Sequence, residues 1–547
     1  MCGIVVTVNA PELERGSIQT GLFRIKDRGP DEHWLEADAW YAAGFVRLAI
    51  ESPQASIGSS NDGQEIIALL NGEIWNYRAL SSAYGLRGIR NEYDFLREAY
   101  RYRGIRLFDD LNGMFAIVIV DKRNKRVVAA RDREGIKPLF LYRAQDGMAV
   151  TLSSHVAGVQ AEDGIALNRD FFVNRFVLGF SDYRNSVIEG IEQVPPSSVV
   201  QIEVDGPRSI SETWEQLGRI GTRSLGSDEA IVAEQLSILD RAVTDTITHG
   251  TGAEVLLLLS GGIDSSLLAL LASRLGFKDR MVGVYVGPPG SPDAEWSRYV
   301  AREAGIRLLT VQPELDGLFE SPGKAALSMG GSSAYTMYWM FARLRKEFPE
   351  SKVVICGEGA DELYLGYPWH ADPSPRIERI VRRHSQVEHS TDLINTVLTA
   401  IENVGAGAQY QHSMFANTDR THQLIDAHLL PFDHASMAHG FEVRVPYLAT
   451  ENVAFADSLV ERGLHTQSWE QKPLLRQLLR SMHEFPERFM TRPKSGLPNA
   501  FDAGFRQPPT EAAASEIASA MPEWFSRIPF PPVLKTWYAE FWLELAK

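Results

Sequence analysis

The sequence predicts two folded units: a layered α+β unit over residues 1–205 and an α/β unit with a parallel sheet over residues 228–547. Three observations support this division. Short β-branched runs alternate with turn signals in the first unit. Continuous apolar runs separated by helical stretches follow residue 227. Between them, residues 206–227 are polar and lack apolar periodicity, so we expect a linker there.

Short apolar runs rich in β-branched residues are the expected strands of the first unit. The dipeptides Asn71-Gly72 and Asn112-Gly113 lie at the ends of such runs and are typical of turns. Either an all-β or a layered α+β arrangement would show this pattern. The runs are Gly3–Val8, Glu65–Leu70, Met114–Val120, Arg126–Ala130, Met148–Leu152 and Ser198–Ile202.

The second unit opens with helical spacing of apolar residues over 230–248 and continues with a buried type of strand over 254–259. Glycines end that strand, and a second helical stretch follows over 267–275. Further apolar runs at 281–286 and 352–355 have helical segments between them. Alternation of strand, loop and helix is typical of a parallel sheet covered on both faces. From about residue 372 we expect a mostly helical C-terminal part.

Composition excludes several classes of protein. The 547 residues are 44% hydrophobic, which excludes disorder as the main state. The 55 basic and 70 acidic residues give a net charge of −15, so we expect no nucleic-acid partner. The two cysteines, Cys2 and Cys356, cannot build a disulfide scaffold or a zinc site. The N-terminus lacks the regions of a signal peptide, and polar residues interrupt the most apolar stretch, 255–272. We therefore expect a cytoplasmic protein with no membrane partner.

The segment SGGIDSS, Ser260–Ser266, follows an expected strand and precedes an expected helix. Its glycines let a ligand approach the backbone, and the helix N-terminus offers N–H groups to an anion. An ordinary turn with Asp264 as helix cap is the alternative, but it explains only the glycines. The segment resembles the PP-loop of ATP pyrophosphatases, which cleave ATP between the α and β phosphates. That resemblance implies ATP contacts for Leu258, Ser260, Gly261, Gly262, Asp264, Ser265, Ser266, Val284 and Gly357.

A second loop, GEGADELYLGY over 357–367, holds three acidic residues within five positions. Glu358, Asp361 and Glu362 would repel one another without a metal ion or a cationic group nearby. A solvated acidic loop is the alternative interpretation. Since Mg²⁺ binds carboxylates together with substrate phosphates, we expect Asp264 and Asp361 to hold Mg²⁺ on pyrophosphate.

Cys2 is a candidate nucleophile. If Met1 is removed, its thiol lies beside its own α-amine, a base with a pKa of about 8. Several motifs of the first unit together resemble the class II glutamine amidotransferases, which implies an Ntn-hydrolase-like αββα sandwich. The motifs are Arg28–Glu32, Arg47 within FVRLAI, Asn71–Tyr77, Leu111–Ala116 and Arg131–Phe140.

The resemblance implies a glutaminase site around Cys2. Asn71 and Gly72 would donate to the oxyanion of the tetrahedral intermediate. Arg47 would bind the carboxylate of glutamine, beside Glu73. Where the family usually has Ser-Asp-Thr-Glu, this chain has Asn-Glu-Tyr-Asp over residues 91–94. Glu92 would then receive the α-amine of glutamine with a longer arm than aspartate.

Both units together resemble the glutamine-dependent asparagine synthetases, from Met1 to about Leu497. The resemblance implies that ATP activates a carboxylate as acyl-AMP, which ammonia from the glutaminase site then attacks. It also implies Glu358 as a base and Lys494 as a stabiliser of charge, although a solvated surface lysine is the alternative for Lys494. Further matching segments are Ser436–Leu448, Lys472–Arg476 and Arg492–Leu497.

The acceptor pocket, formed by His428, Pro431 and Glu362, departs from the family pattern. His428 stands where an aspartate would meet the substrate amine, and Pro431 where an arginine would meet its carboxylate. We therefore expect aspartate to be a poor acceptor. Two alternatives remain: an amidotransferase for another carboxylate in secondary metabolism, and a glutaminase-only protein. The expected partners are L-glutamine, ATP and a small-molecule carboxylate, and a homodimer is compatible with the sequence. Other departures from the family are Cys356, Ala449 and His155.

Overall fold

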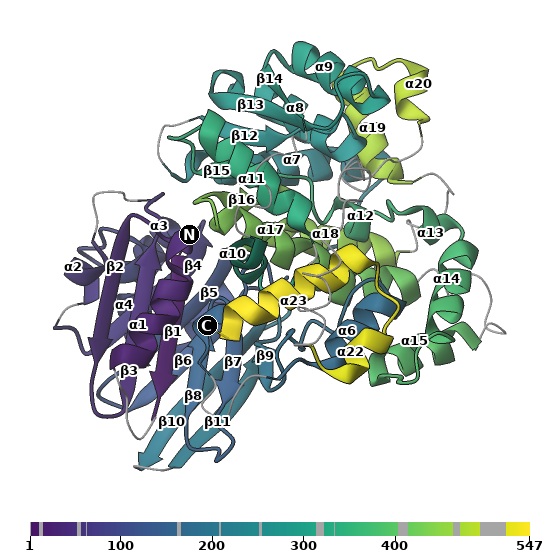
Figure 1. The fold of residues 1–547 in the computed structure, drawn as a ribbon. Coiled ribbons are helices and arrows are strands. Elements are labelled where there is room, and N and C mark those ends of the chain that lie inside the picture. Colours follow the sequence, from purple (N-terminus) through teal and green to yellow (C-terminus); the bar gives the residue numbers. More distant parts are fainter. Residues whose placement is uncertain are drawn as a thin grey trace.

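The structure is a computed structural model, and Figure 1 shows its two units, with the purple and blue N-terminal sheets below the teal parallel sheet. The expected fold class is confirmed. The described residues are 2–9, 15–51, 56–61, 63–160, 166–206, 209–250, 254–312, 322–332, 334–402, 414–462, 471–492 and 521–546.

The first unit is a sandwich of two antiparallel sheets. One six-stranded sheet has the order β2 (Glu32–Ala37), β3 (Tyr41–Arg47), β1 (Cys2–Val8), β8 (Val150–Ser153), β7 (Phe140–Arg143) and β9 (Ile191–Gln193). One five-stranded sheet has the order β11 (Ser209–Gln216), β10 (Ser198–Gly206), β6 (Arg126–Arg131), β5 (Gly113–Asp121) and β4 (Ile66–Ile74).

Helices cover the outer faces of both sheets. Helix α1 (Arg15–Arg24) packs Ile18 and Leu22 against the first sheet, and α4 (Glu92–Arg103) packs against β4 of the second. Every residue of β1, β3 and β4 is buried, because each of these strands is covered on both faces. The layers are therefore α, β, β, α, as an Ntn-hydrolase-like sandwich requires. The short helices of this unit are α2 (Ile57–Asn61), α3 (Tyr77–Ala83), α5 (Leu107–Asp110) and α6 (Arg169–Val177), with 3₁₀ turns η1 (Lys26–Arg28), η2 (Gly104–Arg106) and η3 (Val156–Gly158).

The second sheet extends into the segment expected to be a linker. Strand β11 pairs antiparallel with β10, from Ser198 opposite Gln216 to Gly206 opposite Ser209. It is an edge strand, and most of its side chains are partly or fully exposed. A strand of this kind needs no apolar alternation, which explains why the sequence pattern did not reveal it. The division into residues 1–205, 206–227 and 228–547 stays a prediction.

The second unit contains a five-stranded parallel sheet. Its order is β14 (Arg307–Val311), β13 (Met281–Val286), β12 (Val255–Leu258), β15 (Val353–Ile355) and β16 (Glu442–Arg444). The strands are short and mostly buried, and helices α7, α8, α9 and α19 pack together beside them. These helices span Asp228–Thr248, Ile263–Arg274, Pro292–Ala304 and Pro473–Met482, and η4 (Lys278–Arg280) precedes β13.

The remainder of the second unit is mostly helical, as expected. The C-terminal helix α23 (Pro532–Ala546), yellow in Figure 1, crosses the front of the molecule and packs on α10 (Pro322–Ser328). Within the described residues, no helix is both long and apolar enough to span a bilayer. The other helices are α11 (Tyr335–Glu347), α12 (Ala360–Leu363), α13 (Pro368–Ala371), α14 (Ser374–His384), α15 (Asp392–Glu402), the π-helix η6 (Asp419–Leu429), α17 (Leu430–Met437), η7 (Pro446–Leu448), α18 (Thr450–Glu461), α20 (Glu487–Met490) and α22 (Glu523–Arg527).

Candidate active sites

Strand pairing assembles the predicted glutaminase residues around Cys2. Cys2 begins β1, and the antiparallel register places Arg47 of β3 directly opposite it. The backbone nitrogen of Cys2 donates to Oδ1 of Asn71 on β4, at 3.1 Å. Cys2 is buried, and this burial raises the pKa of its thiol, while the nearby Arg47 opposes the rise. The nucleophile therefore needs a base, and its own α-amine is the one predicted above.

Asn71 and Gly72 have the properties of an oxyanion site. The Nδ2 of Asn71 is buried and has no hydrogen-bond partner within the described residues. Gly72 has a φ of +137°, and a Cβ there would lie 1.9 Å from the carbonyl oxygen of Met114, so only glycine fits. A buried donor without a partner is costly unless a ligand accepts its hydrogen bond. This pair can therefore stabilise negative charge beside the Cys2 thiol.

Tyr93 is a site residue that the sequence analysis did not assign. Its hydroxyl lies 3.9 Å from the Cys2 sulfur, and its ring lies 5.8 Å from the Arg47 guanidinium carbon. Asn91 caps helix α4 by accepting from the Asp94 N–H, which fixes the first turn and so directs Tyr93 inward. The departure from the family pattern at residues 91–94 was the available signal, but it was interpreted only through Glu92.

Two buried carboxyl groups extend the site toward the second unit. Glu92 accepts from the Ile74 N–H at 2.6 Å, and its burial raises its pKa to about 8. Burial also raises the pKa of Glu73, which lies 3.4 Å from Nη2 of Arg444. Arg444 in turn binds Glu442 at 2.5 Å. Through Glu73, the predicted glutamine site thus contacts a buried ion pair of strand β16.

The PP-loop lies at the carboxyl end of the central strand β12. Leu258 of β12 is in register with Val284 of β13, as the predicted ATP contacts require. Gly261 has a φ of +69°, and a Cβ there would lie 2.6 Å from the Ser297 nitrogen. Helix α8 begins at Ile263, so its N-terminal N–H groups face this turn, as an anion site needs. The hydroxyls of Ser260 and Ser265, on either side of this turn in the sequence, lie 3.2 Å apart.

The predicted metal ligands Asp264 and Asp361 are brought together by a lysine. Lys472 Nζ lies 2.5 Å from Oδ2 of Asp264 and 2.7 Å from Oδ1 of Asp361. Gly357 lies in the same place, where a Cβ would be 3.1 Å from the Asp264 Cβ. In this structure the Lys472 ammonium is the cation between the two carboxylates, and their oxygens would also suit Mg²⁺, which needs only one or two protein carboxylates beside phosphate oxygens. The described residues contain no cluster of three or more such ligands.

Lys472 is the main residue that the sequence analysis missed. Its segment KPLLR was noted as a match, but its lysine was given no role. It is buried, with a φ of +54°, immediately before helix α19. The predicted Lys494 lies outside the described residues, whereas Arg492 nearby pairs with Asp293 at 3.0 Å.

Two of the predicted acceptor residues, His428 and Glu362, are linked through Tyr367. His428 Nδ1 lies 3.0 Å from Oε2 of Glu358, and its Nε2 lies 3.3 Å from the hydroxyl of Tyr367. Tyr367 donates to Glu362 at 2.7 Å. Pro431 is buried in α17 and offers neither charge nor donor. Burial raises the pKa of Glu362 to about 7.

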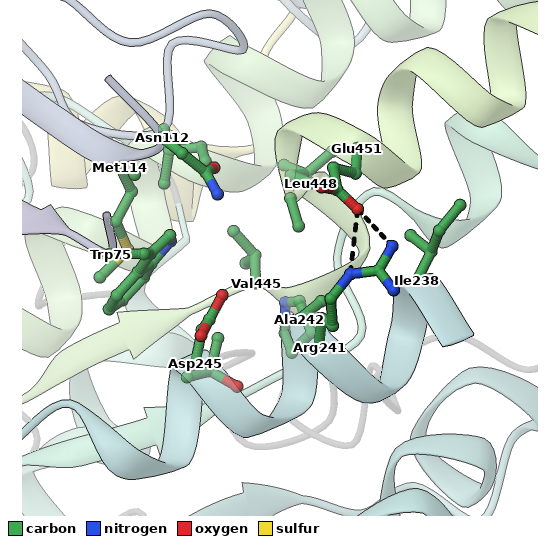
Figure 2. A pocket seen from close by; sticks show the side chains of 15 residues that line it. Trp75, Asn112, Met114, Ile238, Arg241, Ala242, Asp245, Val445, Leu448 and Glu451 are labelled. Atoms are coloured by element: carbon green, nitrogen blue, oxygen red, sulfur yellow. Dashed lines mark hydrogen bonds and ion pairs between the residues drawn. The ribbon is translucent and has the colours of Figure 1, made fainter. Parts of the chain in front are cut away.

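The two units share a polar interface between the sites. Arg28 donates from Nε to the carbonyl oxygen of Cys2 at 3.3 Å and pairs with Asp433 of the second unit at 2.8 Å. A cavity of about 60 Å³ lies at the same interface. Figure 2 shows Trp75 and Met114 of the first unit facing Val445 of the second across it. Arg28 therefore links the backbone of the nucleophile residue to the unit that carries the PP-loop.

The two sites define a class of protein: a glutamine amidotransferase domain joined to a PP-loop synthetase domain. Residues 1–214 match the family model of the glutamine amidotransferase domain, and residues 236–534 match the model of asparagine synthase. Since the second match covers more than half of the chain, this protein belongs to the asparagine synthase family. The resemblance inferred from the sequence is confirmed, and the chain is an enzyme of the asparagine synthase type.

Curated relatives match almost the whole chain. A probable glutamine-hydrolysing asparagine synthetase of Acanthamoeba polyphaga mimivirus is 25% identical, covering 91% of this chain and 85% of its own. The glutamine-hydrolysing asparagine synthetase of Gallus gallus is 26% identical, covering 96% of this chain and 86% of its own. Among solved structures, a glutamine phosphoribosylpyrophosphate amidotransferase from B. subtilis is 14% identical, with a TM-score of 0.28, covering 65% of this chain and 81% of that one.

Proposed function

We propose that this chain is a glutamine-hydrolysing, ATP-dependent ligase that forms an amide from a small-molecule carboxylate. This proposal rests mainly on the presence of both sites in one chain, whose two units are in contact through the Arg28–Asp433 ion pair. The relatives are named glutamine-hydrolysing asparagine synthetases, which supports glutamine and ATP as substrates.

In the first half-reaction, the Cys2 thiol attacks the side-chain amide of glutamine. Asn71 and Gly72 stabilise the oxyanion, and Arg47 binds the α-carboxylate of glutamine. Ammonia leaves, and water then hydrolyses the acyl-enzyme to glutamate. Arg28 binds the Cys2 carbonyl oxygen and Asp433 of the second unit, so the nitrogen is released near the interface between the two units.

In the second half-reaction, an oxygen of the acceptor carboxylate attacks the α-phosphate of ATP, which forms acyl-AMP and releases pyrophosphate. The hydroxyls of Ser260 and Ser265 and the N-terminus of α8 bind phosphate oxygens. Asp264 and Asp361 would hold Mg²⁺, which would supply charge neutralisation on pyrophosphate when bound. Ammonia then attacks the acyl carbon, AMP leaves, and Glu358 takes a proton from the nitrogen.

Two products measured on the same enzyme, glutamate and pyrophosphate, test this proposal. Wild-type enzyme should release glutamate, and should release pyrophosphate when a carboxylate acceptor is present. Cys2→Ala should abolish glutamate release but leave pyrophosphate release with ammonium chloride as nitrogen source. Asp264→Asn should abolish pyrophosphate release but leave glutamate release by the glutaminase site. Equal loss of both activities in either variant would contradict the hypothesis that the two activities belong to separate sites.

A further inference from the structure

A chain of hydrogen-bonded side chains leads away from the predicted base Glu358. Its first contact joins Glu358 to Nδ1 of His428 at 3.0 Å, and its second joins Nε2 of His428 to the Tyr367 hydroxyl at 3.3 Å. Its third joins that hydroxyl to Glu362 at 2.7 Å. We name these four side chains the relay. Every contact in it involves a group that can both accept and release a proton.

The tyrosine of the relay is held rigidly. Its ring stacks on Trp369, with centroids 4.5 Å apart and an interplanar angle of 11°. The Trp369 indole donates to Asp419 at 2.6 Å, and Arg376 pairs with that carboxylate at 2.6 Å. Asp419 is fully buried, so its position is fixed by these partners. The Tyr367 hydroxyl is thus directed at its two relay partners by packing from the side away from the PP-loop.

The histidine of the relay is placed by an irregular helix. His428 lies in the π-helix η6, which continues into α17. Pro431 near the junction cannot donate to the Ala427 carbonyl, and its ring crowds that carbonyl in a regular α-helix. Widened π turns relieve this crowding and rotate the preceding side chains about the helix axis. Pro431 therefore influences the direction of the His428 side chain, and the two residues act together.

We propose that the relay carries away the proton released when ammonia attacks the activated carboxylate, which rests on the function proposed above. The C–N bond forms, the bond from the acyl carbon to the AMP oxygen breaks, and AMP leaves with that electron pair. Glu358 takes the proton that the nitrogen loses. Glu358 passes this proton to the unprotonated Nδ1 of the neutral His428 ring, which restores the carboxylate. His428 in turn passes its Nε2 proton to the Tyr367 oxygen, and Tyr367 passes its own proton to Glu362.

The surroundings of the relay are consistent with this role. Glu362 is 4% exposed and accepts from the Tyr367 hydroxyl, so this carboxylate is placed to receive the proton that Tyr367 passes on. Asp361 faces the same loop but is paired with Lys472, and the His370 ring lies 5.3 Å from that of Tyr367, edge to face. Glu358 is the catalytic residue, and the other three side chains are positioning residues.

Tyr367→Phe removes one hydroxyl from the relay and keeps the ring stacked on Trp369. The matched control is Tyr364→Phe, because Tyr364 is a buried tyrosine of the same loop whose hydroxyl binds Gln235 and Asn452 instead. We expect Tyr367→Phe to lower kcat for amide formation about tenfold or more, within the range of general acid–base effects. The loss should fall on kcat and not on the KM for ammonium, while glutaminase activity and the rates of Tyr364→Phe stay unchanged.

A second measurement needs no acceptor. In histidine-labelled enzyme, with the His428 signals assigned by His428→Asn, the ¹⁵N shifts at fixed pH should report a hydrogen bond of Nε2 that Tyr367→Phe removes. The activity arm uses L-aspartate, MgATP and ammonium chloride. Identical His428 ¹⁵N shifts in wild type and Tyr367→Phe, or identical kcat values, would overturn the relay. If wild type shows this hydrogen bond but releases no pyrophosphate with any carboxylate, the proposed function fails while the hydrogen-bonded chain stands.

Discussion

Lys472 offers the sharpest test of the cation site between the two predicted metal ligands. Its ammonium lies 2.5 Å from Asp264 and 2.7 Å from Asp361, and the lysine is only 5% exposed. Both carboxylates keep its pKa above the ordinary lysine range, against the effect of its burial. Lys472→Met keeps the length of the side chain and removes the charge. It leaves two carboxylates facing each other without their cation.

The size of the effect follows from burial. Removing one partner of a buried ion pair costs about 3–5 kcal/mol, because the remaining charge is left uncompensated. The Asp264 side chain is 19% exposed and that of Asp361 13%, so water recovers part of this cost. We therefore expect Lys472→Met to lower the free energy of unfolding by about 3 kcal/mol, at the lower end of that range.

Urea unfolding measures this loss, with Arg241→Met as the matched control. Arg241 pairs with Glu451, but these side chains are 52% and 45% exposed, so its loss should cost no more than about 1 kcal/mol. If the two carboxylates form a cation site, MgCl₂ should restore more stability to Lys472→Met than to wild type, by about 2.7 kcal/mol at 100 times the dissociation constant. KCl at equal ionic strength should not restore the stability of Lys472→Met in this way. A Lys472→Met protein as stable as Arg241→Met, and indifferent to MgCl₂, would refute this reasoning.

Three further outcomes are expected. Folded Glu92 keeps its proton up to about pH 8, against an ordinary value of 4.5, so wild-type stability should fall as pH rises between those values. Glu92→Gln removes that fall, and urea unfolding should show its advantage over wild type growing from pH 5 to pH 8; a constant difference would contradict the pKa. Asp433→Asn should uncouple the sites, raising the ratio of glutamate to pyrophosphate released with glutamine as nitrogen source, and an unchanged ratio would count against the Arg28 contact. L-aspartate should be a poor acceptor, with kcat/KM below ~10⁴ M⁻¹s⁻¹, and steady-state kinetics above that value would show that other residues pair its charged groups.

The sequence predicted those parts of the molecule that local patterns specify. The strand before Ser260 and the helix after it follow from a buried apolar run, two glycines and helical spacing, and the structure has them as β12 and α8. Strand β3 had no comparable pattern, although it places Arg47 opposite Cys2. Each residue of β3 is buried by layers that belong to distant segments of the chain, so its alternation carries no polar signal.

The residues that escaped prediction are those whose role depends on a partner far along the chain. Lys472 is an ordinary lysine in sequence, and only the meeting of β12, the loop after β15 and the start of α19 places it between two carboxylates. His428 was recognised as a departure, yet its pairing with Glu358 depends on a π-helix, whose register no apolar spacing indicates. Pro431 was interpreted as the loss of a charge from the pocket. Its position directly after that π-helix shows a second consequence: a proline there favours widened turns upstream, which aim His428 at the acidic loop. The departures at His428 and Pro431 that remove substrate contacts can therefore also supply and orient part of the proposed proton path.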